Sequence, residues 1–419
     1  MIWNLPYPVN KNLNPVCSHC MKVALVHELL TMRGGAERVL RVFADLFPDA
    51  PIYTFLYDEK KLGDWFPKER VRTASFPSLF PGFYSLFPSL RTNHHLYLPF
   101  FPRAAEHWDF SGYDLVLSSS SAFAHGIITN GRPKHLCYVQ SPARYLWDRT
   151  HDVLNRAGKE LLGPLKKAYL SHIFNRLRTW DAESSDRPDH LIAASKTVQR
   201  RIELYWRRES EVIYPPIDDF WFEQRKGLGN RSSGIGKSHS YSLSAIPYSL
   251  PYYLVVSTLA PYKRISLAIK ACNQLKARLI IAGDGPAKKS LQAIAGPTIE
   301  FAGHQTDEQL RDLYTDATAT IFPGDEDFGL VPLESLSCGT PVIAFDAGGA
   351  RETLKAGKTC VFFREPTAVS LQTTIAAFDR KAFDSGTCKK AAAKFGRTAF
   401  EKKMKACIDD LMASATLRT

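Results

Sequence analysis

Residues 321–334 read IFPGDEDFGLVPLE, which is a short apolar run, a loop of carboxylates and glycines, and the start of a helix. Pro332 suits the first helical turn, where its missing N–H costs nothing, and Glu334 follows in the same turn. Glu326 lies in the loop, at the carboxyl end of the predicted strand, where open α/β sheets bind their ligands. We therefore expect this stretch to hold a ligand between a sheet and a helix.

The loop suits a polar ligand. Gly329 permits the backbone angles of a tight loop. The amides of Phe328, Gly329 and Leu330 precede the helix, so they can donate hydrogen bonds to sugar hydroxyls or phosphate oxygens. Glu326 and Glu334, with seven residues between them, add two carboxylates.

The run continues as CGTPVIA at 338–344 and GGARE at 348–352. Together with the paired glutamates, it resembles the retaining nucleotide-sugar glycosyltransferases of family 4, and the resemblance extends over residues 21–413. It implies an α/β fold of the GT-B type, with two facing doubly wound parallel-sheet (Rossmann-like) domains and a donor site in the interdomain cleft.

Apolar runs alternate with helical patterns along the chain, which predicts parallel sheets. Consecutive prolines, Pro215 and Pro216, cannot continue a helix or a central strand and mark a hinge. The predicted strands lie at 22–28, 52–57, 114–119, 135–140, 190–195, 211–214, 252–257, 278–282, 298–302, 319–323, 341–345 and 361–363.

The expected organisation is a leader at 1–20, an acceptor-side domain at 21–216, a linker at 217–251, a nucleotide-sugar domain at 252–393 and a helix at 394–419. The resemblance implies that this last helix crosses back to the first domain.

Residues 257–264 read STLAPYKR and follow a predicted strand. The resemblance implies that Lys263 binds the donor diphosphate, whose negative charge grows as the glycosidic bond breaks. Family members commonly have arginine where this chain has Thr258. Either Arg264 supplies that charge or donor binding is weaker, and a solvated Lys–Arg pair at a helix start is the alternative.

Two further loops follow predicted strands of the first domain. Gly34 and Gly35 let backbone amides approach a phosphate or sugar closely, although a plain strand–helix turn explains them as well. The resemblance implies that His125, in the run SSSSAFAHG at 118–126, reaches the donor sugar as a catalytic residue. A lone histidine is also a common structural residue.

Residues 137–148 read CYVQSPARYLWD. They resemble a subgroup of bacterial mannosyltransferases of surface-polysaccharide and lipid-linked oligosaccharide synthesis, with Gln140 where that subgroup has histidine. Arg144 is predicted to meet an acceptor diphosphate, and Tyr145 or Trp147 to stack on a sugar ring. Aromatic packing with a surface arginine explains these residues equally well.

The net charge of +12 favours anionic partners, but no zinc spacing or compact basic helix indicates nucleic acid. The chain has no apolar run of the roughly 18 residues that a spanning helix needs. Residues 76–103 are rich in aromatic residues and proline, and are predicted to dock at an anionic membrane. The alternative is a loop that covers the core. The eight scattered cysteines suit a reducing cytoplasm.

The resemblance implies hexosyl transfer with retention, and GDP-mannose is the preferred donor. The predicted acceptor is a glycan or a polyprenyl-diphosphate-linked sugar. Glu334 is expected to hold the ribose hydroxyls, and Glu326, with Lys263 and His125, to act at the reacting sugar. No cofactor or bound metal is expected. A sugar-nucleotide epimerase of the same fold and a non-catalytic nucleotide-sugar binder are the alternatives.

Overall fold

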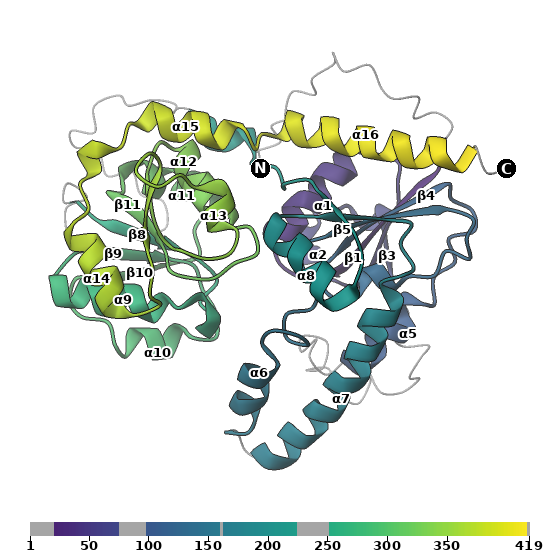
Figure 1. Ribbon diagram of the computed structural model, residues 1–419, viewed down its shortest axis with the longest axis horizontal. Helices are drawn as coiled ribbons and strands as arrows, with labels where there is room; N and C mark the ends of the chain where they lie inside the picture. Colours follow the sequence, from purple (N-terminus) through teal and green to yellow (C-terminus); the bar gives the residue numbers. More distant parts are fainter. Residues whose placement is uncertain (1–20, 75–97, 160–161, 224–250, 417–419) are drawn as a thin grey trace. The chain divides into compact units, whose positions relative to one another are not determined.

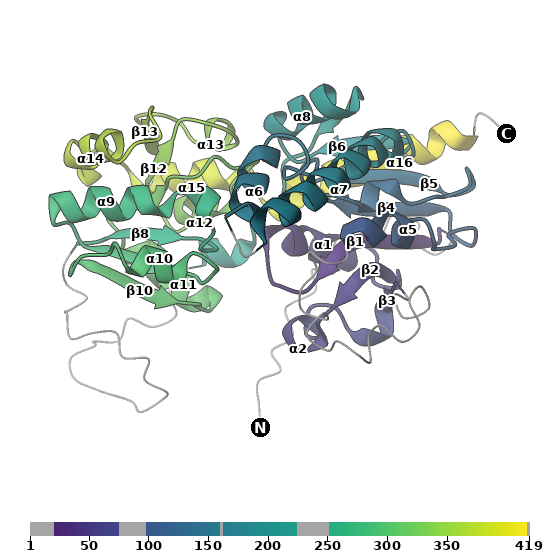
Figure 2. The ribbon, with the colours of Figure 1, turned by 90° about the horizontal axis from the view of Figure 1, so that it is seen from below.

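The computed structural model describes residues 21–74, 98–159, 162–223 and 251–416 (Figures 1 and 2). Contacts divide the chain into two units, which are described separately. Unit 1 holds the residues up to Cys137 together with Asp152–His190, and unit 2 holds Tyr138–His151 and the residues from Leu191 onward.

The first sheet has seven strands, and β1 lies inside it with parallel neighbours on both sides. Leu25 of β1 is opposite both Ile52 and Leu117. β1 is buried along nearly its whole length, which is typical of a strand covered on both faces. The order is β3 (Val71–Thr73), β2 (Ile52–Tyr57), β1 (Val23–Leu30), β4 (Leu115–Ser120), β5 (Lys134–Val139), β6 (His190–Ala193) and β7 (Glu211–Val212).

Aromatic side chains fill part of the core of unit 1. Phe55 stacks on Phe101 and on Trp108, with ring centroids 5.1 and 5.2 Å apart. The helices that accompany this sheet along the chain are α1 (Gly35–Leu46), α2 (Glu59–Leu62), α5 (Phe101–Ala105), α6 (Thr150–Ala157), α7 (Gly163–Ser184) and α8 (Lys196–Trp206).

The second sheet has six parallel strands and lies in unit 2. Successive residues of a strand point to opposite faces, so Leu254 and Val255 of β8 enter two separate apolar clusters. The order is β10 (Ile299–Gly303), β9 (Leu279–Ala282), β8 (Tyr253–Val256), β11 (Ala319–Phe322), β12 (Val342–Phe345) and β13 (Cys360–Phe363).

Helices cover both faces of this sheet (Figure 2). Ile269 of α9 joins the cluster around Val255, whereas Tyr314 of α11 and Leu333 of α12 join the cluster around Leu254. The helices are α9 (Ile265–Leu275), α10 (Lys288–Gln292), α11 (Asp307–Asp316), α12 (Leu330–Ser337), α13 (Ala350–Thr353), α14 (Ala368–Ala376) and α15 (Ser385–Ala393).

The predicted fold class, α/β with two doubly wound parallel sheets, is confirmed. Every predicted strand is present within a few residues of its expected bounds, and the edge strand β3 was not predicted. The last helix, α16, spans Arg397–Thr416, and the ring of its Phe400 lies 5.8 Å from that of Tyr138 in β5. No helix in the described ranges has the length and apolar character needed to cross a membrane.

Part of the predicted membrane segment 76–103 lies outside the described residues, as do the predicted leader at 1–20 and residues 224–250 of the linker. The described end of that segment packs inside unit 1, because Phe101 is buried and stacks on Phe55. That end therefore fits the alternative of a segment that covers the core.

The turn after β9 supplies a test of the packing around β8. Gly283 has φ +128°, and a Cβ there would overlap the carbonyl oxygen of Ser257. Gly357 has φ +70° and open space around it. We predict that Gly357→Ala lowers the free energy of unfolding by about 1–2 kcal/mol, from backbone strain alone. The steric overlap should raise the loss to about 2–5 kcal/mol for Gly283→Ala. Chemical denaturation measures both, and equal losses would contradict the steric argument.

Candidate functional site

The order of the six-stranded sheet places two loops side by side. The chain runs from β8 outward through β9 to β10 and then returns to β11, on the other side of β8. The loops that leave the carboxyl ends of β8 and β11 therefore turn in opposite directions. The crevice at such a reversal is where doubly wound sheets bind ligands. Residues 257–264 and 323–329 form these two loops.

The two loops bring Lys263 and Glu326 together. The Lys263 ammonium lies 2.6 Å from Oε1 of Glu326, and both side chains are largely shielded from water. The two loops pack closely here, since a Cβ on Gly324 would be in van der Waals contact with Cα of Lys263, 3.5 Å away. An ammonium has three N–H donors, so Lys263 can hold Glu326 and still donate to a phosphate. The sequence predicted both residues for the site, but not that they form an ion pair.

A glycine pair after β12 fixes the loop that carries Glu326. The Gly349 amide donates to the Glu326 carbonyl at 2.9 Å. Gly348 has φ +55°, and a Cβ there would overlap the same carbonyl. Only glycine fits at Gly348, because both the backbone angle and the close approach exclude a side chain. The GGARE run thus has a local function in positioning Glu326.

Helix α12 begins at Leu330, after Gly329 with φ +85°. Gly329 has no side chain with which to cap the helix, so the first amides of α12 remain suited to a ligand. Phe328 is buried and stacks on Tyr214, with ring centroids 5.6 Å apart. The structure therefore places the predicted residues 328–330 at the helix start, as expected.

The position of Pro332 predicted that Glu334 lies in the first turn of the helix, and this prediction is wrong. Glu334 is the fifth residue of α12, so it lies in the second turn. Its side chain is buried, and Oε2 accepts a hydrogen bond of 2.8 Å from the Tyr314 hydroxyl of α11. Tyr314 therefore orients the carboxylate. The ribose-binding role of Glu334 stays a prediction.

Arg264 follows Lys263 in the left-handed conformation, with φ +54°. Its guanidinium lies over the ring of Phe345, 5.1 Å from the ring centroid. Its Nη1 is buried and has no hydrogen-bond acceptor among the described residues. Thr258, which stands where the family commonly has arginine, is exposed. The replacement of that missing charge by Arg264 stays a prediction.

The predicted acceptor-side residues lie in unit 2. The Arg144 guanidinium pairs with Asp148 at 3.2 Å and with Asp327 at 3.6 Å. Trp147 stacks on Tyr205 with ring centroids 4.8 Å apart, so one face of its indole is covered by protein. Tyr145 is half-buried. Arg144 is thus tied to the same carboxylate-rich loop as Glu326, and the acceptor roles stay predictions.

The seven-stranded sheet has its own reversal, between β1 and β4. The Gly34–Gly35 loop follows β1, and the Gly34 amide donates to Oε2 of Glu37 at 3.0 Å. The other oxygen of Glu37 lies 3.7 Å from Nε2 of His27. Burial lowers the pKa of His27, but the carboxylates of Glu37 and Glu28 outweigh it, and the net pKa is raised.

Glu28 anchors the loop after β4. A single oxygen, Oε1, accepts hydrogen bonds from the Ser120 hydroxyl and from the amides of residues 121–124, at 2.7–3.0 Å. Burial raises the pKa of Glu28, whereas the charge of His27 and the amide donors lower it, and the net pKa is lowered. Glu28 is therefore a buried carboxylate that holds this loop in one conformation.

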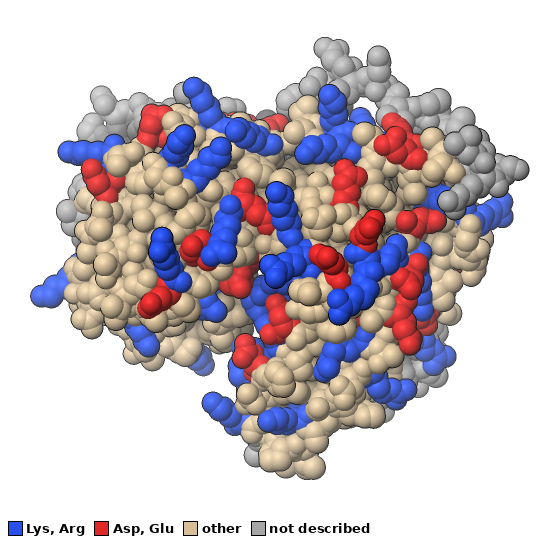
Figure 3. Space-filling view, in the orientation of Figure 1, with Lys and Arg blue, Asp and Glu red and all other residues tan. Residues whose placement is uncertain are grey.

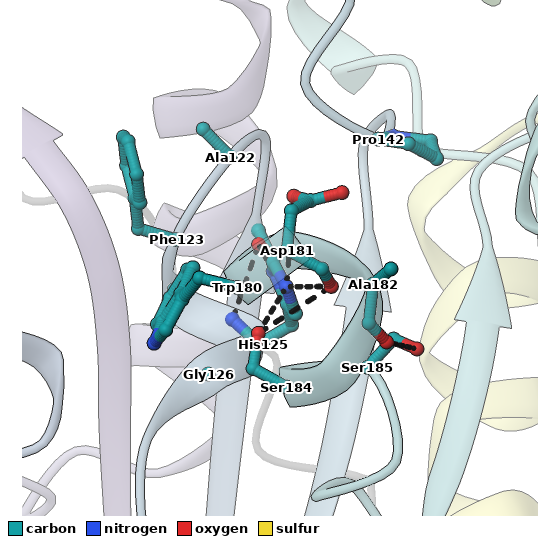
Figure 4. Close-up of polar contacts among 12 residues, drawn as sticks. Ala122, Phe123, His125, Gly126, Pro142, Trp180, Asp181, Ala182, Ser184 and Ser185 are labelled. Carbon is teal, nitrogen blue, oxygen red and sulfur yellow. Dashed lines mark hydrogen bonds and ion pairs between the residues drawn. The ribbon is translucent and has the colours of Figure 1, made fainter. Parts of the chain in front are cut away.

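His125, in the same loop, is completely buried (Figure 4). Its Nδ1 lies 3.3 Å from the Ser120 hydroxyl, and its Nε2 lies 3.1 Å from the Ser184 hydroxyl and 3.3 Å from the Asp181 carbonyl. Burial lowers the pKa of His125, and the Asp181 carboxylate only partly opposes it. The ring is engaged by protein groups, as in the structural alternative, and its catalytic role stays a prediction.

The sequence reasoning missed several residues that shape these loops. Glu28 carried a signal, since it is a charged residue inside the apolar run VALVHELL. Asp181, Ser184 and Tyr314 carried none, because their partners lie 20 to 59 residues away along the chain. Glu352 was quoted only as part of a motif, yet its carboxylate accepts from the amides at the start of α8, 2.8 Å away.

Comparison with known proteins supports the resemblance. Residues 244–395 match the family of group 1 glycosyl transferases. A D-inositol 3-phosphate glycosyltransferase of Thermobispora bispora is 32% identical over 242 residues, which is 51% of this chain and 54% of that relative. A GDP-mannose-dependent alpha-mannosyltransferase of Mycobacterium tuberculosis is 34% identical over 114 residues, 27% of this chain and 30% of that relative. The chain thus spans about half the length of the Thermobispora bispora relative and less than a third of the Mycobacterium tuberculosis relative.

Solved structures share the fold. HepE of Anabaena, crystallised with UDP-glucose, is 18% identical, with a TM-score of 0.64 over 93% of this chain and all of that chain. Sucrose-phosphate synthase of Thermosynechococcus elongatus is 15% identical, with a TM-score of 0.60. At these identities the likeness concerns the architecture alone.

The Glu28 anchor predicts a pH-dependent stability. Glu28→Gln should lower the free energy of unfolding by about 1–3 kcal/mol near neutral pH, because buried amides lose a charged acceptor. Since the pKa of Glu28 is lowered on folding, its contribution is present above the unfolded pKa and is lost as the pH falls through the folded pKa. The difference in the free energy of unfolding between wild type and Glu28→Gln should therefore become smaller in acid.

Denaturation at several pH values measures this difference in the free energy of unfolding, with Glu69→Gln as the control. Glu69 is an exposed carboxylate of the same unit, so its substitution should have little effect at any pH. A gap between wild type and Glu28→Gln that is constant from neutral pH into acid would show that the charge of Glu28 is not responsible.

Proposed function

We propose that this chain, which carries a group 1 glycosyl transferase domain over residues 244–395, moves a hexosyl group from a nucleotide-diphosphate sugar to an acceptor hydroxyl. The observation that carries the proposal is the Lys263–Glu326 pair at the reversal of the six-stranded sheet. A cation and a carboxylate lie there beside an uncapped helix start, a combination that suits a diphosphate joined to a sugar.

Each group has one proposed role. Lys263 neutralises the diphosphate, whose charge grows as the glycosidic bond breaks, and a fixed cation favours that change. Glu326 accepts hydrogen bonds from hydroxyls of the donor sugar. Glu334, oriented by Tyr314, accepts from the ribose hydroxyls. In the proposed mechanism the configuration is retained through departure on the front face, and the leaving phosphate takes the acceptor proton.

The proposed donor is GDP-mannose. Support comes from the Mycobacterium tuberculosis relatives, among them a GDP-mannose-dependent alpha-(1-6)-phosphatidylinositol dimannoside mannosyltransferase that is 36% identical over 97 residues. The rival donor is UDP-glucose, the ligand in the HepE complex. The proposed acceptor is a glycan or a polyprenyl-diphosphate-linked sugar. A putative colanic acid glycosyltransferase of Salmonella typhimurium, 26% identical over 190 residues, is consistent with such an acceptor.

Two rival functions use the same donor site. A sugar-nucleotide epimerase would consume the donor without any acceptor. A non-catalytic binder would bind nucleotide without turnover. Release of GDP from GDP-mannose, measured with and without a lipid-linked sugar acceptor, separates the three functions, since only a transferase responds to the acceptor.

Lys263 supplies a binding test. Lys263→Ala should weaken GDP binding by about 1.5–3 kcal/mol, or roughly 10- to 150-fold, because a charged hydrogen bond to phosphate is lost. GMP, which lacks the second phosphate, should lose less. Calorimetry measures both ligands, and Lys270→Ala on α9 is the control, since it removes an exposed charge from the same sheet domain. Unchanged GDP affinity in Lys263→Ala would move the phosphate site elsewhere.

The two glutamates should separate kinetically. Glu334→Ala should mainly raise the donor KM, because a ribose contact is shared by the ground state and the transition state. Glu326→Ala should mainly lower kcat, because its contacts strengthen as the donor sugar reacts. Steady-state kinetics over donor concentration measures both variants. Equal and mild effects on KM and kcat would refute this division of roles.

A further inference from the structure

The amino-terminal end of α7 carries an exposed apolar surface. Helix α7 is anchored by its carboxyl half, where Phe174 and Leu177 are buried. Its amino-terminal half is different, because every residue of 164–169 is exposed. In Figure 1 this half meets the end of α6 at the lower edge of the drawing. We name residues 156–159 and 162–169 the α7 tip, and all of them lie in unit 1.

Three large apolar side chains of the α7 tip point into water. Leu165, Leu162 and Tyr169 are 70%, 68% and 58% exposed. In the described chain, Val369 is 70% exposed and Met32 55% exposed, and the other exposed large apolar side chains are less exposed than these. Leu165 and Tyr169 are four residues apart in α7, so they lie on one side of the helix. Leu162 directly precedes the first residue of α7, so the three apolar side chains are gathered at one end of the helix.

Leu162 is also strained in its backbone. It has φ +59°, the left-handed conformation, in which a bulky side chain is strained and asparagine or glycine is preferred. Its side chain gains little packing in return, since most of it is exposed. A leucine that is both strained and exposed does not contribute to the stability of the fold, which points to a contact outside the chain.

Two contacts join the described parts of the α7 tip. A Cβ on Gly163 would overlap the backbone of Gly158, so the backbone after α6 and the start of α7 approach closely at two glycines. The Lys167 ammonium donates to the Asn155 side chain of α6 at 3.2 Å, which ties the two helices together. A preorganised surface loses little conformational entropy on binding.

The α7 tip also carries basic side chains. Arg156, Lys159, Lys166 and Lys167 are all exposed. These four basic residues outnumber the two acidic residues of the sequence from 152 to 169, Asp152 and Glu160. In Figure 3, which has the orientation of Figure 1, the lower end of the molecule is mostly tan, with blue Lys and Arg side chains on it. Shallow apolar burial combined with attraction to acidic headgroups is how peripheral proteins bind anionic membranes.

We propose that the α7 tip docks on the surface of an anionic phospholipid bilayer, with Leu162, Leu165 and Tyr169 inserted among the headgroups. A bilayer fits better than a protein partner, because three apolar side chains on a narrow helical end cover far less than the roughly 800 Å² per partner of a stable protein interface. Docking does not depend on the proposed transfer reaction, since it is measured without donor or acceptor.

Co-sedimentation of the full chain with vesicles tests the proposal. The vesicles are phosphatidylcholine alone or phosphatidylcholine mixed with phosphatidylglycerol. Wild type should bind the anionic vesicles and be released by salt. Leu165→Ser/Tyr169→Ser should lower the partition coefficient about tenfold, because two inserted side chains are lost. Lys159→Gln/Lys166→Gln should weaken binding and flatten its dependence on salt.

Matched variants separate docking from general effects. Val369→Ser removes an apolar side chain that is also 70% exposed, and Lys402→Gln/Lys403→Gln removes two exposed charges from α16, so both should bind as wild type does. Leu162→Asn should weaken binding while the melting temperature stays equal or rises, because asparagine tolerates the left-handed conformation. A structural role for Leu162 would lower the melting temperature instead.

Three results would overturn the proposal. The first is wild type that does not bind anionic vesicles. The second is Leu165→Ser/Tyr169→Ser binding as well as wild type. The third is a wild-type dimer, seen by light scattering, that Leu165→Ser/Tyr169→Ser dissociates while vesicle binding persists. In that case the partner of the α7 tip would be a second copy of the chain.

Discussion

Each sheet of this protein starts from an inner strand, and the chain must reverse direction to build the second half of the sheet. That constraint decides where the chemistry lies. At β8 and β11, and again at β1 and β4, two loops leave neighbouring strands in opposite directions. Lys263, Glu326 and the Gly34–Gly35 loop are all found at these reversals. The glycines at 283 and 348 then fix the loops by close backbone approach, so the sites are positioned by main chain more than by side-chain packing.

The carboxylates at the two reversals have different partners. Glu28 is buried, and one of its two carboxylate oxygens is surrounded by backbone amides of its neighbouring loop. Glu326 is paired with one flexible ammonium on the neighbouring loop, a contact that can be shared or exchanged. A buried carboxylate satisfied by amides stabilises a loop, whereas an ion pair at a crevice suits binding. This contrast favours the six-stranded sheet as the place of donor chemistry.

Much of this arrangement could be predicted from local sequence. Alternating apolar runs placed the strands, and the run from 321 to 334 placed Glu326 in a loop after β11. Strand β3 was missed because three residues that include Arg72 give no apolar pattern. Glu334 was assigned to the first turn because Pro332 was taken as its opening residue, whereas α12 begins two residues earlier. Residues such as Tyr314 and Asp181 act through distant partners, which a single sequence without an alignment does not reveal.

The Glu28 anchor also bears on how unit 1 folds. The donors that satisfy its carboxylate lie 92 to 96 residues further along the chain. A charged group without partners is costly to remove from water, so Glu28 is expected to stay hydrated until those donors arrive. Closing a loop of that length is slow, because its entropy is lost before the contacts form. We therefore expect β1–β4 pairing and dehydration of Glu28 to form one late, cooperative step, before which the β1 edge remains unpaired and open to aggregation.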